Sequence, residues 1–148
     1  MTEQAEITAF YELSQAKARY CRALDARDWA LLAELMTADM KFGLSDGDSE
    51  PEMITGRDNA LSTLQSLVAD AKTVHQVSMP AIDLNGDEAR VIWAMQDRAV
   101  FADGLSVTGY GYYHERWLRE NGNWKIASLK LIHLILDVQQ ASSTGTDF

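Results

Sequence analysis

The sequence predicts an α+β fold: a cone-shaped α+β barrel in which three N-terminal helices pack in a strongly curved antiparallel sheet. Two observations support this prediction. Apolar residues recur at helical spacing in the first 70 residues, whereas long β-type runs fill the chain from Thr73 onward. Asn-Gly or Asp-Gly pairs, which are strong hairpin signals, separate these runs at Asn85-Gly86, Asp103-Gly104 and Asn121-Gly122. Helices followed by an antiparallel meander are typical of an α+β layer architecture.

The N-terminal half carries the helical signals. Leu13 and Tyr20 belong to an apolar stripe of helical period, which favours a long first helix. Asp28 is a suitable N-cap for a second helix, and Thr55-Gly56 precedes a third periodic segment. The predicted elements are helices at 3–24, 26–36 and 55–70, a strand at 38–45 and a loop at 46–53.

The C-terminal half carries the strand signals. We expect four strands, at 73–84, 88–101, 106–118 and 124–137. The polar, small residues that follow predict a loose tail at 138–148, and the whole chain 1–148 is expected to form a single domain.

Composition and charge narrow the choice of partner. Hydrophobic residues make up 47% and charged residues 24% of the chain, which are ordinary values for a folded globular protein. The net charge of −9 disfavours nucleic acid and anionic membranes, so a neutral or cationic small molecule or another protein is the expected partner. The acidic N-terminus does not resemble a signal peptide, and no apolar run reaches the ~20 residues that span a bilayer. A cytoplasmic location is therefore expected.

Alternation along the strands predicts which side chains face the interior. In 88–101, the bulkier apolar row contains Trp93 and Met95, so Asp97 on the same row should also point inward. An ionised carboxylate there is costly without a partner. In 106–118, Gly109 and Gly111 on one row suggest a bend or room for a ligand. If this row lines a cavity, Tyr113 points into it and His114 points away. On the first long strand, we expect Thr73, Val77 and Met79 to share the side of His75.

The candidate catalytic set is Tyr20, Asp25, His75 and Asp97, and at least three of these four polar residues are predicted to point inward. A neutral imidazole is a base suited to neutral pH, and a carboxylate can orient it and stabilise its protonated form. A tyrosine hydroxyl can donate to a carbonyl oxygen that becomes an enolate. The set therefore suits proton transfer next to a carbonyl. Substrate contacts are expected from Trp93, Met95 and Tyr113.

Other chemistries have weaker support. Cys21 lies in a predicted helix interior, where a cysteine is usually a small hydrophobic residue rather than a nucleophile. His114 and His133 show no ligand spacing with His75, so no metal site is expected. Structural roles also stay open: His75 and Tyr20 are also compatible with hydrogen-bonded core positions, and Asp25 with a local turn.

Several motifs resemble the SnoaL-like branch of the nuclear-transport-factor-2-like superfamily, over about residues 5–137. The similar stretches are "YCRALDARDWALLAELMTADM", "ITGRDNAL", "KTVHQV" and "GYGYYHERWLRENGNWKI". The pattern residues within them are Tyr20, Asp25, Asp28-Trp29, Gly56-Arg57, Thr73-Val74-His75 and Gly122-Asn123-Trp124-Lys125-Ile126.

The sequence is most similar to the scytalone dehydratase and bile-acid dehydratase group within that superfamily. This resemblance implies active-site roles for Tyr20, Asp25 and His75, and also for Asp97. It also implies a homo-dimer or homo-trimer that uses the outer face of the sheet. That face is predicted to carry Ile92, Ala94, Gln96, Arg98, Val100, Tyr110 and Tyr112.

Three functions follow as hypotheses. The first is a cofactor-independent dehydratase that removes water from a cyclic or polycyclic β-hydroxy carbonyl compound. His75 takes the proton, Asp25 or Asp97 orients it, and the imidazolium then protonates the departing hydroxyl. The second is a ketosteroid-isomerase-like enzyme with Asp97 as base. The third is a non-catalytic small-molecule-binding module or a structural protein like a dioxygenase β-subunit.

Overall fold

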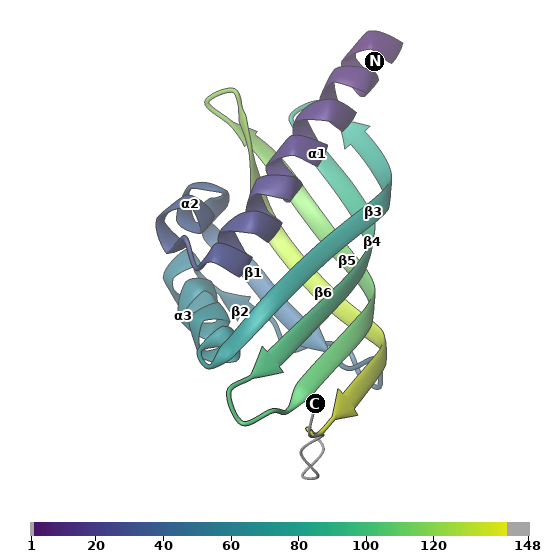
Figure 1. Cartoon of the computed structure of the whole chain (residues 1–148). Coiled ribbons are helices and arrows are strands. Elements are labelled where there is room, and N and C mark those ends of the chain that lie inside the picture. The colour runs from purple at the N-terminus through teal and green to yellow at the C-terminus, as the bar shows by residue number, and fades with distance from the viewer. Residues whose placement is uncertain (1, 142–148) are drawn as a thin grey trace.

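The computed structural model describes residues 2–141, and it confirms the predicted α+β fold with helices before the long strands. Three helices pack against a six-stranded sheet, and Figure 1 shows that this sheet is curved. The elements are α1 (Glu3–Ala26), α2 (Trp29–Glu34), β1 (Met36–Ser45), β2 (Ile54–Thr55), α3 (Arg57–Val68), β3 (Ala71–Asn85), β4 (Glu88–Phe101), β5 (Ser106–Glu120) and β6 (Asn123–Gln139).

The helix boundaries follow from local capping. The Thr2 hydroxyl accepts a hydrogen bond from the amide of Ala5 at the start of α1, and Arg27 ends this helix in a left-handed conformation with φ 62°. Asp28 caps α2 as predicted, because its carboxylate accepts from the amide of Leu31 at 3.2 Å. The chain therefore turns sharply between α1 and α2.

The four long strands form the predicted antiparallel meander, and the sheet order is β2-β1-β6-β5-β4-β3. The sheet is mixed rather than wholly antiparallel, because β1 pairs in parallel with β6. It is also open, with β2 and β3 at its two edges. The parallel pair joins segments far apart in the chain, so local periodicity carried no signal for it. Strand β6 continues to Gln139, two residues into the predicted tail, and residues 142–148 lie outside the described residues.

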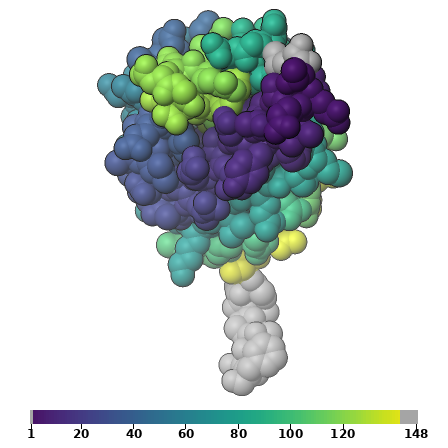
Figure 2. All heavy atoms as spheres, turned by 90° about the horizontal axis from the view of Figure 1, so that it is seen from above, coloured from purple at the N-terminus to yellow at the C-terminus, as the bar shows by residue number. Residues whose placement is uncertain are grey.

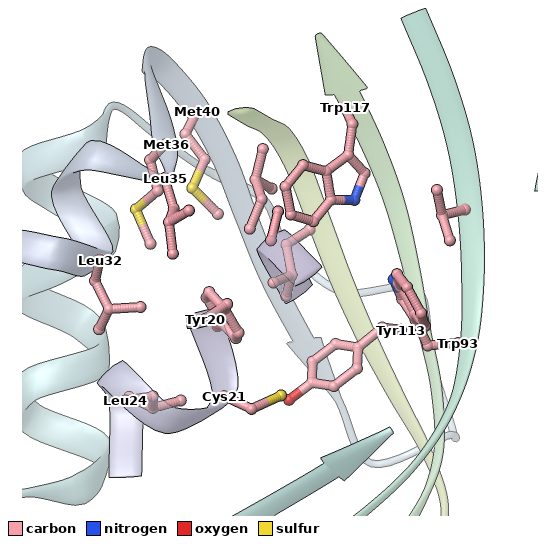
Figure 3. Packing of buried hydrophobic residues seen from close by; sticks show 14 of the residues in the cluster. Tyr20, Cys21, Leu24, Leu32, Leu35, Met36, Met40, Trp93, Tyr113 and Trp117 are labelled. Atoms are coloured by element: carbon pink, nitrogen blue, oxygen red, sulfur yellow. The ribbon is translucent and has the colours of Figure 1, made fainter. Parts of the chain in front are cut away.

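Helix α1 lies across the concave face of the sheet, and α2 and α3 lie beside the C-terminal end of α1 (Figure 1). Figure 2, seen from above, shows α1 running along one face of the molecule. The core lies between this helix and the sheet. Figure 3 shows Tyr20 from α1 facing Trp93, Tyr113 and Trp117 from the sheet.

The predicted inner rows are correct for β4 and β5. Trp93, Met95 and Tyr113 are each at most 5% exposed. Met79 is a correction, because it is 80% exposed instead of sharing the inner side with His75. The pairing of β3 with β4 shifts register between Ser78 and Ala81, and Met79 has φ 45° at this bulge. A bulge inserts an extra residue and thereby reverses the alternation.

Candidate active site

His75 is held by Asp25 at the C-terminal end of α1. The Oδ1 atom of Asp25 lies 2.6 Å from Nδ1 of the His75 ring, and its Oδ2 atom accepts from the His75 backbone amide at 2.9 Å. Sequence reasoning left the partner open between Asp25 and Asp97, and the structure pairs His75 with Asp25. An ionised carboxylate can only accept a hydrogen bond, so Nδ1–H of His75 donates to it, and in a neutral ring Nε2 is the nitrogen with a lone pair.

A second layer of hydrogen bonds holds Asp25 itself. The Thr73 hydroxyl donates to Oδ1 of Asp25 at 3.0 Å and accepts from the Arg27 guanidinium at 2.8 Å. Arg27 also donates to the carbonyl oxygens of Leu24 and Val68, which ties the end of α1 to the end of α3. Arg27 is a positioning residue that the sequence analysis missed, and no local pattern indicated it.

The pKa of Asp25 reflects this environment. Burial by itself raises the pKa, but hydrogen bonds from the side chain and backbone of His75 and from Thr73 outweigh it. The pKa of Asp25 is therefore lowered below its ordinary value of 3.8, and the group is a carboxylate at neutral pH. A carboxylate in this position can fix the ring tautomer and can stabilise an imidazolium at His75.

Asp97 has a different partner, His133 on β6. The Nε2 atom of His133 lies 3.1 Å from Oδ2 and 3.3 Å from Oδ1 of Asp97. The His133 and Asp97 side chains are only 8% and 18% exposed. His133 was set aside in the sequence analysis because it has no metal-ligand spacing with His75, but the structure brings it to the same site.

A β-bulge in β6 also keeps simple strand alternation from indicating that His133 faces the interior. Trp124 and Ile126 face the core, and continuing their alternation would send His133 outward. The pairing of β5 with β6 shifts register there, so Ile126 and Ala127 are both buried and the alternation reverses. His133 then shares the inner face with Leu131. The sequence signal that could have placed His133 on the inner face is the alternation of apolar residues between the bulge and His133.

His75 from the first pair and both members of the second pair, Asp97 and His133, line a cavity of about 150 Å³. Its walls come from every layer of the fold, and its apolar rim includes Leu44, Leu67 and Leu136, which are 40–44% exposed. The cavity lies where β3 and β5 begin and where β4 and β6 run to their ends. The polar lining residues are Tyr20, Thr73, His75, Asp97, Arg98, Tyr113 and His133.

Tyr20 and Tyr113 supply the phenol groups of the cavity. Burial raises the pKa of both hydroxyls well above 10, and the nearby charge of Glu115 adds to the effect on Tyr20. Both side chains therefore stay neutral and can donate a hydrogen bond to a bound oxygen atom. Their rings meet edge to face with centroids 6.4 Å apart.

The remaining predicted residues lie outside the cavity wall. Trp93 and Met95 point inward but do not line the cavity, so their predicted contact with substrate stays a prediction. The indole of Trp93 instead donates to the buried carboxylate of Glu115 at 2.7 Å. Burial also raises the pKa of the Cys21 thiol, which disfavours the nucleophilic thiolate. In residues 2–141, no group of three or more His, Cys, Asp or Glu side chains is arranged to hold a metal ion.

The comparison with known families identifies the family of this fold. The model of the SnoaL-like domain matches residues 5–130. The chain belongs to the SnoaL-like family.

This SnoaL-like chain is also similar to individual proteins, at low sequence identity. A relative from Gibberella zeae named "Probable cyclase FGR4" is 26% identical over 140 residues, which covers 82% of this chain and 89% of the relative. A candidate scytalone dehydratase from Novosphingobium aromaticivorans superposes with a TM-score of 0.81 at 21% identity, over 99% of this chain and all of its own. The hexachlorocyclohexane dehydrochlorinase LinA-type3 from Novosphingobium barchaimii superposes with a TM-score of 0.78 at 15% identity, over 99% and 98% of the two chains.

The SnoaL-like family and the cavity support an enzyme that processes a small molecule. At such low identities, the structural neighbours establish the fold and not the reaction. No helix in residues 2–141 has the length and apolar character needed to cross a membrane.

Proposed function

We propose that this SnoaL-like protein is a cofactor-independent dehydratase that removes water from a cyclic β-hydroxy carbonyl compound. The observation that carries the proposal is the pairing of Asp25 with Nδ1 of His75 at 2.6 Å, which leaves Nε2 of His75 as a base beside an apolar cavity. The nearby phenols of Tyr20 and Tyr113 are neutral donors for a carbonyl oxygen.

The proposed reaction begins with removal of a proton from the carbon next to the carbonyl. The lone pair on Nε2 of His75 takes this proton, and Asp25 stabilises the resulting imidazolium. The electrons of the broken C–H bond move onto the carbonyl oxygen, where Tyr20 and Tyr113 donate hydrogen bonds to the enolate. The enolate then re-forms the carbonyl and a C=C bond forms. The C–O bond breaks with its electrons on oxygen, and the β-hydroxyl takes the proton held by the His75 imidazolium and leaves as water.

The cavity restricts the size of the substrate. Its volume of about 150 Å³ is smaller than the ~300–1,000 Å³ common for small-molecule sites, which favours one or two rings over a larger polycyclic system. The exposed leucines at the rim favour an uncharged, apolar body over an anion or a cation. Simple cyclic β-hydroxy ketones are therefore suitable test compounds.

A product analysis with 3-hydroxycyclohexanone and 3-hydroxy-1-tetralone tests the proposal. We expect wild type to convert at least one of them with loss of one water, as measured by mass spectrometry, in buffer with and without EDTA. His75→Gln should lower kcat by about 10²–10⁴-fold, the range typical of a general base. His114→Gln is the matched control, because His114 faces away from the cavity. Equal activity in wild type and His75→Gln would overturn the mechanism, and wild type inert on both compounds would overturn the substrate class.

A second candidate is a cyclase, which the relative named "Probable cyclase FGR4" favours. The same His75 base would form an enolate, but the enolate carbon would attack a second carbonyl of the same molecule. Heptane-2,6-dione tests this reaction, because its aldol ring closure conserves mass. Isomerisation, the alternative with Asp97 as base, is tested with cyclohex-3-enone, which also conserves mass on conversion to cyclohex-2-enone. Faster turnover of either compound than of the β-hydroxy ketones would favour the corresponding reaction.

We also propose that the protein self-associates as a dimer or trimer through the outer face of its sheet. Large apolar side chains lie exposed on this face across neighbouring strands, which is the composition of a surface that another subunit covers. They include Ile92, Val100, Tyr110 and Tyr112, each 39–43% exposed.

A further inference from the structure

The cavity has a second imidazole–carboxylate pair that the proposed function does not use. His133 and Asp97 lie on the same face of the sheet as His75, and all three side chains line the cavity. Asp97 is the direct cross-strand neighbour of His75, so the two pairs stand side by side. The sequence predicts that His75 performs both proton transfers, whereas the structure supplies another imidazole for one of them.

The two histidines offer opposite ring nitrogens. His75 gives Nδ1 to Asp25, which leaves Nε2 free for a ligand. His133 gives Nε2 to Asp97, which leaves Nδ1. In a neutral His75 ring, Nδ1 carries the proton that faces Asp25, so the free Nε2 has a lone pair. The carboxylate of Asp97 can neutralise a protonated His133 ring, whose free nitrogen would then carry a proton.

The backbone is shaped to allow the second pair to form. A Cβ atom on Gly109 would lie 2.2 Å from Oδ1 of Asp97 and 2.6 Å from Nε2 of His133. Only glycine therefore leaves room for these two side chains to meet over β5. A β-bulge in the same region places Gly111 opposite His133. The row of Gly109 and Gly111, which in the sequence suggested a bend or room for a ligand, therefore makes room for the pair of Asp97 and His133.

We propose that the two pairs divide the elimination, with His75 as the base and His133 as the acid that protonates the departing hydroxyl. This inference rests on the proposed dehydratase function. Nε2 of His75 takes the proton from the α carbon, and the C–H electrons end in the new C=C bond. The C–O bond breaks with its electrons on oxygen, and the proton on Nδ1 of His133 completes the water molecule. His75 then loses its proton to solvent and His133 regains one, which restores the starting state.

Deuterium exchange separates the two steps. The test compound is whichever of 3-hydroxycyclohexanone and 3-hydroxy-1-tetralone the wild type converts faster, incubated in D₂O. Incorporation of deuterium at the α carbon of unreacted compound, followed by NMR, reports the base step. Formation of the dehydrated product reports the complete elimination. Circular dichroism checks that each variant is folded.

His133→Gln should lower elimination by about 10²-fold or more while α-exchange persists, because the base pair is intact. Asp97→Asn should also lower elimination while α-exchange persists. This variant keeps the test valid if His133→Gln does not fold. His75→Gln should lose both steps, and His114→Gln should keep both. Unchanged elimination in folded His133→Gln and Asp97→Asn, or equal loss of exchange and elimination, would overturn the inference. Failure of the proposed function has a different signature, namely an inert wild type or a fully active His75→Gln.

Discussion

Lys17 and Glu115 form an ion pair in the core of the protein, where neither side chain is exposed to solvent. The second carboxylate oxygen of Glu115 accepts from the indoles of Trp93 at 2.7 Å and Trp117 at 2.9 Å. A buried ion pair is weak evidence for stability, because desolvation offsets much of the attraction. Its position suggests a role in orienting side chains around it.

The ammonium group of Lys17 also contacts both tyrosines of the cavity. It lies 4.1 Å from the ring centroid of Tyr20 and 3.6 Å from that of Tyr113. Cation–π contacts of this kind favour one ring placement over others. The pair of Lys17 and Glu115 thus connects the core to the two phenols that line the cavity.

Lys17→Met should destabilise the protein by about 3–5 kcal/mol, because it leaves the Glu115 carboxylate buried without a cation. Urea unfolding measures the free energy of unfolding. The double variant Lys17→Met/Glu115→Gln should recover part of the loss, since the uncompensated charge is gone. Lys72→Met is the control at an exposed lysine and should change stability by no more than ~0.5 kcal/mol. A Lys17→Met protein as stable as wild type would contradict the energetic role of the pair.

Asp25 should make a pH-dependent contribution to stability. Its folded-state pKa lies below the ordinary value of 3.8, so the carboxylate stabilises the folded state above that pH. The contribution is lost as the pH falls through the lowered pKa. The difference in unfolding free energy between wild type and Asp25→Asn should therefore be present at neutral pH and shrink below pH 3.8. Urea titrations across this range measure it, and a difference that grows toward low pH would refute the assignment.

Gly109→Ala should disrupt the Asp97–His133 pair, because the new methyl group would overlap both side chains. We expect a loss of about 1–3 kcal/mol in unfolding free energy from overpacking, together with impaired elimination. Gly86→Ala is the comparison, since its Cβ would meet nothing within 4 Å. That variant should lose about 1–2 kcal/mol from its left-handed backbone and retain activity. Full elimination activity in Gly109→Ala would mean that the pair is dispensable.

Replacing Tyr112 by Lys should weaken self-association if the outer sheet face is the interface. A buried, unpartnered charge at the centre of an apolar contact disfavours assembly. Sedimentation velocity should show a dimer or trimer for wild type and a shift toward monomer for Tyr112→Lys. Tyr11→Lys is a control at another exposed tyrosine, on α1, and should leave assembly unchanged. A wild type that is monomeric at all concentrations would remove this proposal.

Local patterns in the sequence predicted much of the fold. Turn residues and helical spacing gave the order of the elements, and the Asp28 cap set the start of α2. Strand alternation correctly placed Asp97 and Tyr113 on the inner face. Alternation gave the wrong side for Met79, where a bulge adds a residue, and a bulge before His133 reverses the alternation in the same way. Bulges depend on pairing with a neighbouring strand, so a single strand's sequence does not reveal them.

The sequence by itself indicated an inward direction for several polar side chains, such as Tyr20 and Asp97, because direction follows the helical and strand periods wherever no bulge intervenes. Only the tertiary structure decided which of them meet. Asp25 and His75 are 50 residues apart, Asp97 and His133 are 36 apart, and Lys17 and Glu115 are 98 apart. The register of neighbouring strands and the packing of α1 on the sheet bring together residues that lie this far apart in the sequence. Both arise from the packing of the whole chain, and no local segment encodes them.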